Sequence, residues 1–307
     1  MSTWLAPLLL CIAVGVHAAE PGFIAFSEAE KLRILSHGPW PPQPPRDPAN
    51  EVSGKREAIA LGERLFFEPR LSGTGTVLCA SCHAPFRAFQ DARPRGFGLE
   101  EVERNTPTLL NVGFYRRFGW DGSRASLASQ SIRPLLEPRE MRSSPAHVAA
   151  LVRKRFAPDY ASAFGAPPPA DDAALLASVG KALAAYQETL ITGRTPFDDF
   201  RDALERGAVA AMASYPAAAR RGLQIFVGKG TCHACHSGPL FSSGATVAGF
   251  RVPALRNVAL TAPYMHDGGV ATLADAARHH SQAALTAGES EDLVAFLQSL
   301  TERSQLQ

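Results

Sequence analysis

The chain has 307 residues, of which 46% are hydrophobic and 20% are charged, and its formal net charge is +2. This composition is typical of a soluble globular protein large enough for two domains, and it excludes a disordered chain. Because the longest basic run is the cluster at residues 153–155, the charge pattern also speaks against nucleic acid as a main partner.

The first nineteen residues differ in composition from the rest of the chain. Residues 1–19 contain no Lys, Arg, Asp or Glu, and an apolar run from Leu5 to Val16 ends in the small-residue pattern of residues 16–18. This pattern is typical of a cleaved signal peptide, and the run is too short to span a bilayer. We therefore predict an exported, periplasmic protein without a membrane span, preceded by a signal peptide at residues 1–19.

Helical patterns separated by prolines follow along the chain. Six prolines between Pro39 and Pro48 predict an extended lead-in. Apolar spacing, caps and prolines predict helices over residues 54–67, 144–156, 171–190 and 216–227, and a last helix that begins at a capping box of Thr286 and Glu289. No strand pattern is sustained, so we predict a mainly α-helical fold with little strand.

All four cysteines outside the predicted signal peptide fall into two Cys-x-x-Cys pairs, each followed by histidine. Residues 79–83 read CASCH and residues 232–236 read CHACH. Two thiols at this spacing can form thioethers with the two vinyl groups of one porphyrin, and the adjacent histidine can ligate its iron. The sequence therefore predicts two covalently bound haem c groups, held by Cys79, Cys82 and His83 and by Cys232, Cys235 and His236.

Other uses of these cysteines fit the pattern less well. A zinc ribbon needs two pairs about 15–20 residues apart, whereas about 150 residues separate the pairs here. A thioredoxin-like site needs one pair in a βαβ context, and two disulfides would not need a histidine after each pair.

A helix followed by a Cys-x-x-Cys-His motif occurs twice, which indicates a duplication. We accordingly expect two cytochrome c-like haem domains, an N-terminal one at residues 20–195 and a C-terminal one at residues 196–307.

Several long motifs resemble the bacterial di-haem cytochrome c peroxidase and MauG superfamily. They are residues 62–72 (GERLFFEPRLS), 104–111 (RNTPTLLN), 120–122 (WDG), 251–257 (RVPALRN) and 260–268 (LTAPYMHDG). The resemblance extends from about residue 54 to 301. Residues 35–48 and 118–122 particularly resemble the MbnH-type branch of the MauG-like enzymes.

The resemblance implies that hydrogen peroxide reacts at the N-terminal haem. It places Trp120 between the haems as a relay for oxidising equivalents, and Gln130, Pro134 and Glu140 in the distal pocket of the N-terminal haem. A carboxylate can move a proton between the two oxygens of peroxide, so Glu140 is the acid/base candidate and Gln130 its hydrogen-bonding partner. Without the resemblance, Glu140 would be taken for a solvated loop carboxylate.

The resemblance also implies a calcium ion between the haem domains. Asn105, Thr261 and Pro263 match positions that supply its oxygen ligands, which suit a hard cation. No acidic cluster announces this site independently.

Two departures from the family pattern bear on reactivity. In the peroxidases a histidine several residues before the position of Asn105 caps the N-terminal haem until the enzyme is half reduced. Here no histidine occurs between His83 and His147, so we expect that haem to be open at rest, as in MauG.

The second departure concerns the C-terminal haem. His280 stands where the peroxidases have methionine and MauG-type enzymes have tyrosine, so we predict His280 as the distal ligand of this haem. His279 and Met265 are the alternatives.

These observations favour a periplasmic di-haem enzyme that reacts with peroxide and oxidises a small exported partner protein. The first alternative is a cytochrome c peroxidase that takes electrons from a small cytochrome or cupredoxin. The second is a non-enzymatic electron carrier, which would gain nothing from an open coordination site.

Overall fold

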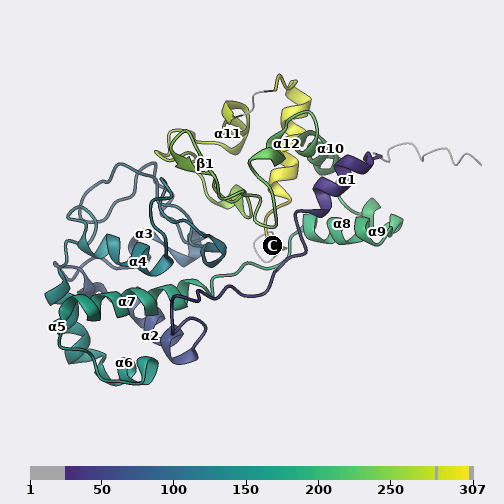
Figure 1. Cartoon of the computed structure of the whole chain (residues 1–307). Coiled ribbons are helices and arrows are strands. Elements are labelled where there is room, and N and C mark those ends of the chain that lie inside the picture. Colours follow the sequence, from purple (N-terminus) through teal and green to yellow (C-terminus); the bar gives the residue numbers. More distant parts are fainter. Residues whose placement is uncertain (1–24, 281–282, 304–307) are drawn as a thin grey trace, which may run out of the picture.

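Twelve α-helices and one two-stranded sheet, with short 3-10 segments, form the regular structure of the residues described by this computed structural model, 25–280 and 283–303 (Figure 1). The prediction of a mainly α-helical chain with little strand is confirmed. The predicted signal peptide lies outside the described residues.

The helices are α1 (Glu28–Leu35), α2 (Arg56–Phe66), α3 (Cys79–Cys82), α4 (Leu127–Leu136), α5 (Pro145–Arg155), α6 (Ala157–Phe164), α7 (Asp172–Gln187), α8 (Pro196–Glu205), α9 (Val209–Ala213), α10 (Ala217–Val227), α11 (Leu273–His280) and α12 (Ala287–Gln298). Strands β1 (Thr246–Val247) and β2 (Phe250–Arg251) pair antiparallel.

The five helices predicted from the sequence are present as α2, α5, α7, α10 and α12. Side-chain caps at Ser144, Asp171 and Thr286 accept hydrogen bonds from backbone N–H groups of the first turns of α5, α7 and α12. The capping box of Thr286 and Glu289 forms as predicted. The sequence did not predict α4, because Pro134 lies in its interior and interior prolines usually end helices.

Two separate hydrophobic clusters form the core of the described chain. The first comprises buried side chains between Val52 and Tyr186 and is built around the packing of α7 against α2 and α4. The second comprises Phe26, Ile34 and buried side chains between Phe197 and Leu300, around the packing of α10 against α12.

The same close helix contact occurs in both clusters. A Cβ atom at Gly62 in α2 would lie 2.0 Å from the carbonyl oxygen of Ala182 in α7, and one at Gly222 in α10 would lie 1.9 Å from that of Asp292 in α12. Only glycine permits these two backbone contacts. The repetition of one packing device is in keeping with a duplicated helix pair.

The N-terminal arm, residues 25–50, connects the two clusters. From α1, which packs against α8 and α10, the chain runs beside the segment that follows α7 and then reaches α2 (Figure 1). Trp40 fastens the arm to that segment, because its indole N–H donates to the carbonyl oxygen of Thr192 at 3.0 Å. The domain boundary at residues 195 and 196 stays a prediction. Within the described part of the chain, no helix is long and apolar enough to cross a membrane.

Candidate haem and redox site

The first cysteine pair forms its own short helix. Cys79 and Cys82 begin and end α3, so the two thiols are one turn apart and lie on the same side. Burial raises the pKa of Cys79 to about 12 and that of Cys82 to about 11, so both are neutral thiols at neutral pH. None of the four described cysteines forms a disulfide, so their sulfur atoms are available for thioethers.

Each histidine that follows a cysteine pair is oriented by a backbone carbonyl. The ring Nδ1 of His83 lies 3.1 Å from the carbonyl oxygen of Phe89, and that of His236 lies 3.0 Å from the carbonyl oxygen of Phe241. Donation from Nδ1–H selects the tautomer whose Nε2 carries the lone pair, as in metal-bound histidines. Burial also lowers the pKa of His83, which favours the neutral, ligating form.

Both acceptor carbonyls belong to a phenylalanine in the left-handed backbone region. Phe89 and Phe241 each have φ of 55°, a conformation that costs a residue other than glycine about 1–3 kcal/mol. In both halves, therefore, the carbonyl oxygen of a phenylalanine with positive φ accepts the hydrogen bond from Nδ1 of the haem-motif histidine. The thiols and the oriented imidazoles fit a c-type haem in each half.

Trp120 lies where the two halves of the chain meet. Its indole N–H donates to the carbonyl oxygen of Asn105 at 2.7 Å, and the N–H of Asn105 donates to the carbonyl oxygen of His266 at 2.9 Å. The N–H of Arg251, at the end of β2, donates to the carbonyl oxygen of Trp120 at 2.8 Å. Trp120 is thus hydrogen-bonded directly to the C-terminal half and, through Asn105, to a second loop of it.

The turn that carries Trp120 has a counterpart in the C-terminal half. Residues 118–124 and 264–270 are each closed by an antiparallel backbone bridge. In each turn an aspartate, Asp121 or Asp267, accepts a hydrogen bond at 3.0 Å from the N–H two residues later. His266 holds the place in its turn that Trp120 holds in the first.

Glu140 is mostly buried beside Arg133. The side chain of Glu140 is 23% exposed, and Arg133 in α4 donates to its Oε1 at 3.2 Å. Burial raises the pKa of Glu140, whereas the charge of Arg133 opposes that shift. The carboxylate also contributes to the raised pKa values of Cys79 and Cys82, so it lies on the side of the first cysteine pair.

The backbone of Glu140 is hydrogen-bonded to residues 99 and 100, which lie in the histidine-free stretch between His83 and His147. Leu99 donates its N–H to the carbonyl oxygen of Glu140 at 3.0 Å, and Glu100 donates to that of Arg139 at 2.9 Å. A Cβ atom at Gly98 would lie 2.5 Å from the carbonyl oxygen of Glu140. Any side chain at Gly98 would therefore displace Glu140 or the loop.

Helix α4 presents Gln130 and Pro134 one turn apart on the same side. Gln130 is half-buried, and its Oε1 lies 3.5 Å from the Cβ position of Gly119, which precedes Trp120. The carbonyl oxygen of Pro134 accepts a hydrogen bond from the N–H of Met141 at 3.2 Å. This bond holds the segment that contains Glu140 next to the end of α4. The four predicted distal and relay residues thus belong to one continuous region of the N-terminal half.

The other predicted ligands are less defined. His280 ends α11 and its side chain lies outside the described residues, whereas His279 is exposed and Met265 is half-buried with φ of 72°. The choice among these three stays a prediction. Within the described residues, no group of three or more His, Cys, Asp or Glu side chains could hold a metal ion. A calcium site at Asn105, Thr261 and Pro263 would need carbonyl and amide oxygens.

His37 was not predicted as a site residue, but the structure places it beside the second haem motif. His37 is 1% exposed, and its ring stacks on Phe241 with centroids 4.2 Å apart. Its Nδ1 lies 2.9 Å from the carbonyl oxygen of Gly238, and burial lowers its pKa to about 4. No local pattern around this histidine could have predicted so distant a contact.

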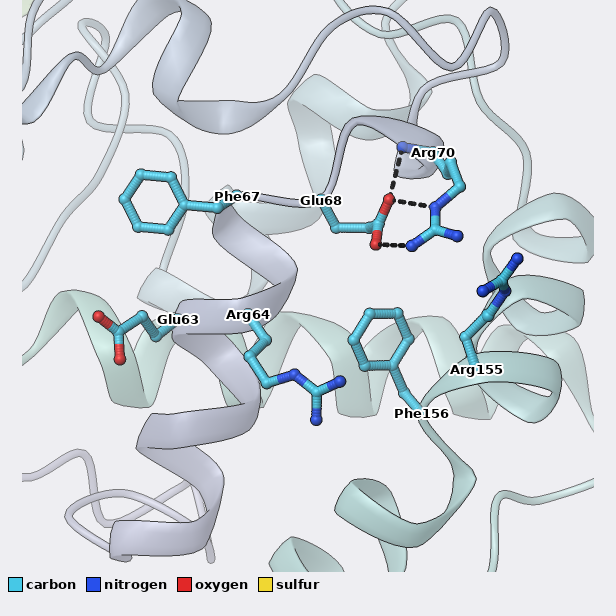
Figure 2. A pocket seen from close by; sticks show the side chains of 7 residues that line it. All are labelled: Glu63, Arg64, Phe67, Glu68, Arg70, Arg155 and Phe156. Atoms are coloured by element: carbon cyan, nitrogen blue, oxygen red, sulfur yellow. Dashed lines mark hydrogen bonds and ion pairs between the residues drawn. The ribbon is translucent and has the colours of Figure 1, made fainter.

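A cavity of about 450 Å³ lies between α2 and the junction of α5 and α6, and Figure 2 shows the side chains that line it. Arg70 binds Glu68 through two hydrogen bonds of 2.5 and 2.6 Å, which lowers the pKa of Glu68. None of the predicted site residues lines this cavity. It is separate from the candidate redox site.

Comparison with known proteins agrees with this geometry. Residues 56–206 match the family model described as di-haem cytochrome c peroxidase. The methylamine utilization protein MauG of Methylorubrum extorquens is 32% identical over 302 residues, covering 85% of this chain and 82% of that protein. The cytochrome c551 peroxidase of Pseudomonas aeruginosa is 32% identical over 278 residues, covering 78% of each.

Among solved structures, a MauG-like protein associated with microbial copper homeostasis superposes with a TM-score of 0.72 at 29% identity, covering 88% of this chain and 96% of that one. The chain therefore belongs to the di-haem cytochrome c peroxidase family, which includes MauG. It is a peroxide-dependent di-haem oxidoreductase, so the predicted enzyme class is confirmed and the alternative of a non-enzymatic carrier is wrong.

Proposed function

We propose that this protein is a MauG-like enzyme of the periplasm. It reacts with hydrogen peroxide at the N-terminal haem, shares the oxidising equivalents with the C-terminal haem, and oxidises a side chain of a small exported partner protein. The observation that carries this proposal is the lack of any histidine between His83 and His147. Without an imidazole in this stretch, the chain has no counterpart of the residue that caps the peroxidases at rest.

The two haem groups, when bound, supply the iron that reacts with peroxide and stores oxidising equivalents. In our proposal the cysteines of each pair hold one group through thioethers, and His83 and His236 are the proximal ligands. The carbonyl oxygens of Phe89 and Phe241 fix both imidazoles in the ligating tautomer. His280 is the proposed distal ligand of the second group, and calcium between the halves is proposed from resemblance alone.

Glu140 acts in this proposal as the proton carrier of the distal pocket. To accept the proton of one peroxide oxygen and return it to the other, a carboxyl group needs a pKa close to the working pH. Burial raises the pKa of Glu140 toward that range, and Arg133 limits the rise. Gln130 supplies a hydrogen-bonding amide in this proposal, and Pro134 lies one turn later on the same side of α4 as Gln130.

Trp120 is the proposed relay between the two haem groups. Its indole is half-buried and its backbone and ring are hydrogen-bonded to loops of both halves. An aromatic ring fixed at this junction can pass an electron in either direction without moving.

The second candidate function is that of a cytochrome c peroxidase supplied by a small cytochrome or cupredoxin. It is favoured by the similarity to cytochrome c551 peroxidase, because the sequence identity to that protein is 32%, the same as the identity to MauG. The two functions differ in the redox state that reacts with peroxide.

Stopped-flow mixing with peroxide therefore separates the two functions. We expect the fully oxidised protein to react at least as fast as the half-reduced protein. A reaction that begins only after half reduction would favour the peroxidase function.

A further inference from the structure

Three exposed arginines that form no ion pair with a described carboxylate flank Trp120. Arg116, Arg117 and Arg124 are exposed, and their side chains form no ion pair or hydrogen bond with any residue that the structure describes. The only acidic residue among positions 115–124 is Asp121, which accepts from the N–H of Ser123 and whose pKa is lowered by that hydrogen bond and in part by the charge of Arg124. With three arginines and one aspartate, this turn carries a net positive charge at the surface.

The C-terminal half adds an uncharged surface beside these arginines. Residues 243–249 are all exposed and contain no charged side chain. They belong to the hairpin of β1 and β2, whose Arg251 donates its N–H to the carbonyl oxygen of Trp120 at 2.8 Å. On the other side of the turn, Thr246 Oγ1 lies 3.4 Å from the Cβ position of Gly122. The turn and the hairpin form one continuous face.

This face has the composition of a docking site for an acidic protein. Protein interfaces combine an uncharged, partly apolar centre with arginines, and here Val247, 49% exposed, stands in the uncharged part. Unpaired guanidinium groups attract carboxylates and speed association with a partner of opposite charge. Because no carboxylate within the described chain forms an ion pair with these arginines, a complementary partner must bring its own.

We propose that Arg116, Arg117 and Arg124, together with the hairpin at residues 243–249, dock an acidic surface of the partner protein that gives up electrons at Trp120. This inference rests on the relay role proposed for Trp120. In each cycle one H2O2 and two protons become two H2O, and two electrons leave the partner one at a time.

The test uses the holoprotein and two reduced donors of opposite charge, an acidic cupredoxin and a basic small cytochrome c. We compare their peroxide-driven oxidation by the wild-type protein, by the triple variant R116Q/R117Q/R124Q and by a control variant, K154Q/R155Q/R206Q. The control also removes three exposed positive charges, from α5 and the end of α8.

At low ionic strength we expect the first triple variant to lower kcat/KM for the acidic cupredoxin about tenfold, and the control to change it by less than about twofold. Added salt removes the difference, and the basic cytochrome c shows no loss. Equal effects of the two triple variants, or a wild-type protein that prefers the basic donor, would overturn the proposal.

Two further measurements distinguish protein docking from a chemical defect, from membrane binding and from self-association. Peroxide added without a donor reacts at the same rate with the wild-type protein and the first variant. A fully oxidised wild-type protein that does not react with peroxide would mean that the proposed function fails, whereas a docking defect alone changes only the donor kinetics. If the first variant keeps its donor kinetics but loses binding to vesicles of anionic lipid, or changes its elution in size-exclusion chromatography, the face serves a membrane or a second copy and the docking proposal is wrong.

Discussion

Glu140 and Arg133 show how two side chains set the protonation of the candidate pocket. Burial of the Glu140 carboxyl group, which is 23% exposed, raises its pKa, and the positive charge of the Arg133 guanidinium 3.2 Å away opposes that shift. Arg133 itself is 47% exposed, so it can be changed without disturbing the core.

Replacing Glu140 with glutamine removes the proposed proton carrier and keeps the size of the side chain. We expect Glu140→Gln to slow peroxide cleavage about 10²- to 10⁴-fold while both haem groups stay attached, as measured by stopped-flow absorbance. Glu291→Gln, which removes an exposed carboxylate from α12, is the control. Unchanged kinetics in Glu140→Gln would remove the role from this residue.

Arg133→Gln is expected to shift the pH dependence of the same reaction. Since Arg133 lowers the pKa of Glu140, its loss raises that pKa. The carboxylate form accepts the peroxide proton, so the acidic limb of the rate profile moves to higher pH. Arg133→Lys keeps the positive charge, so its rate profile lies close to that of the wild type. An Arg133→Gln profile that does not move would show that the pair does not control the reaction.

The paired helices α2–α7 and α10–α12 carry the two cores, and each pair depends on a glycine contact. Helices with clear caps and apolar spacing could be predicted from the sequence alone, because those signals are local. Helix α4 was missed because its proline argues locally against a helix, while the packing of α4 on α7 comes from distant residues. The contact of residues 98–100 with Glu140 could not be predicted either, because it joins segments that are about forty residues apart.

Gly222→Ala is expected to destabilise the C-terminal core. The new methyl group would meet the carbonyl oxygen of Asp292 at 1.9 Å, so α10 must move away from α12. Overpacking of this kind costs about 1–3 kcal/mol or more, which denaturant unfolding can measure. Gly288→Ala in α12 has no atom within 4 Å and serves as the control; equal stability of the two variants would contradict the role of this close contact.

At the level of the whole molecule, the N-terminal arm and the Trp120 turn hold the two halves together. The haem motifs could be predicted directly, because attachment needs only residues close together in the chain. The distal residues needed a family resemblance, since Glu140 and the first cysteine pair come together only in the folded chain. His37 could not be predicted, because its partner Phe241 lies about two hundred residues away.

His37 makes the docking of the arm sensitive to pH. The pKa of its imidazole falls from 6.5 to about 4 on folding. As pH falls below 6.5, His37 becomes protonated in the unfolded chain but stays neutral in the folded chain. The free energy of unfolding therefore decreases between pH 6.5 and about 4. We expect His37→Phe to reduce the loss of unfolding free energy between pH 7 and pH 5 by about 2 kcal/mol, whereas His147→Gln, an exposed control, leaves it unchanged. An unaltered loss in His37→Phe would show that His37 does not cause it.

Sharing of oxidising equivalents between the halves through Trp120 is the central claim, and one spectrum tests it most directly. One equivalent of peroxide is added to the fully oxidised protein, and the Soret and near-infrared regions are recorded for the wild type and for Trp120→Phe. We predict a fast Soret change with a new near-infrared band in the wild type, and loss of that band in the variant. A resting wild-type protein that does not react, or a variant with the same band, would contradict the claim.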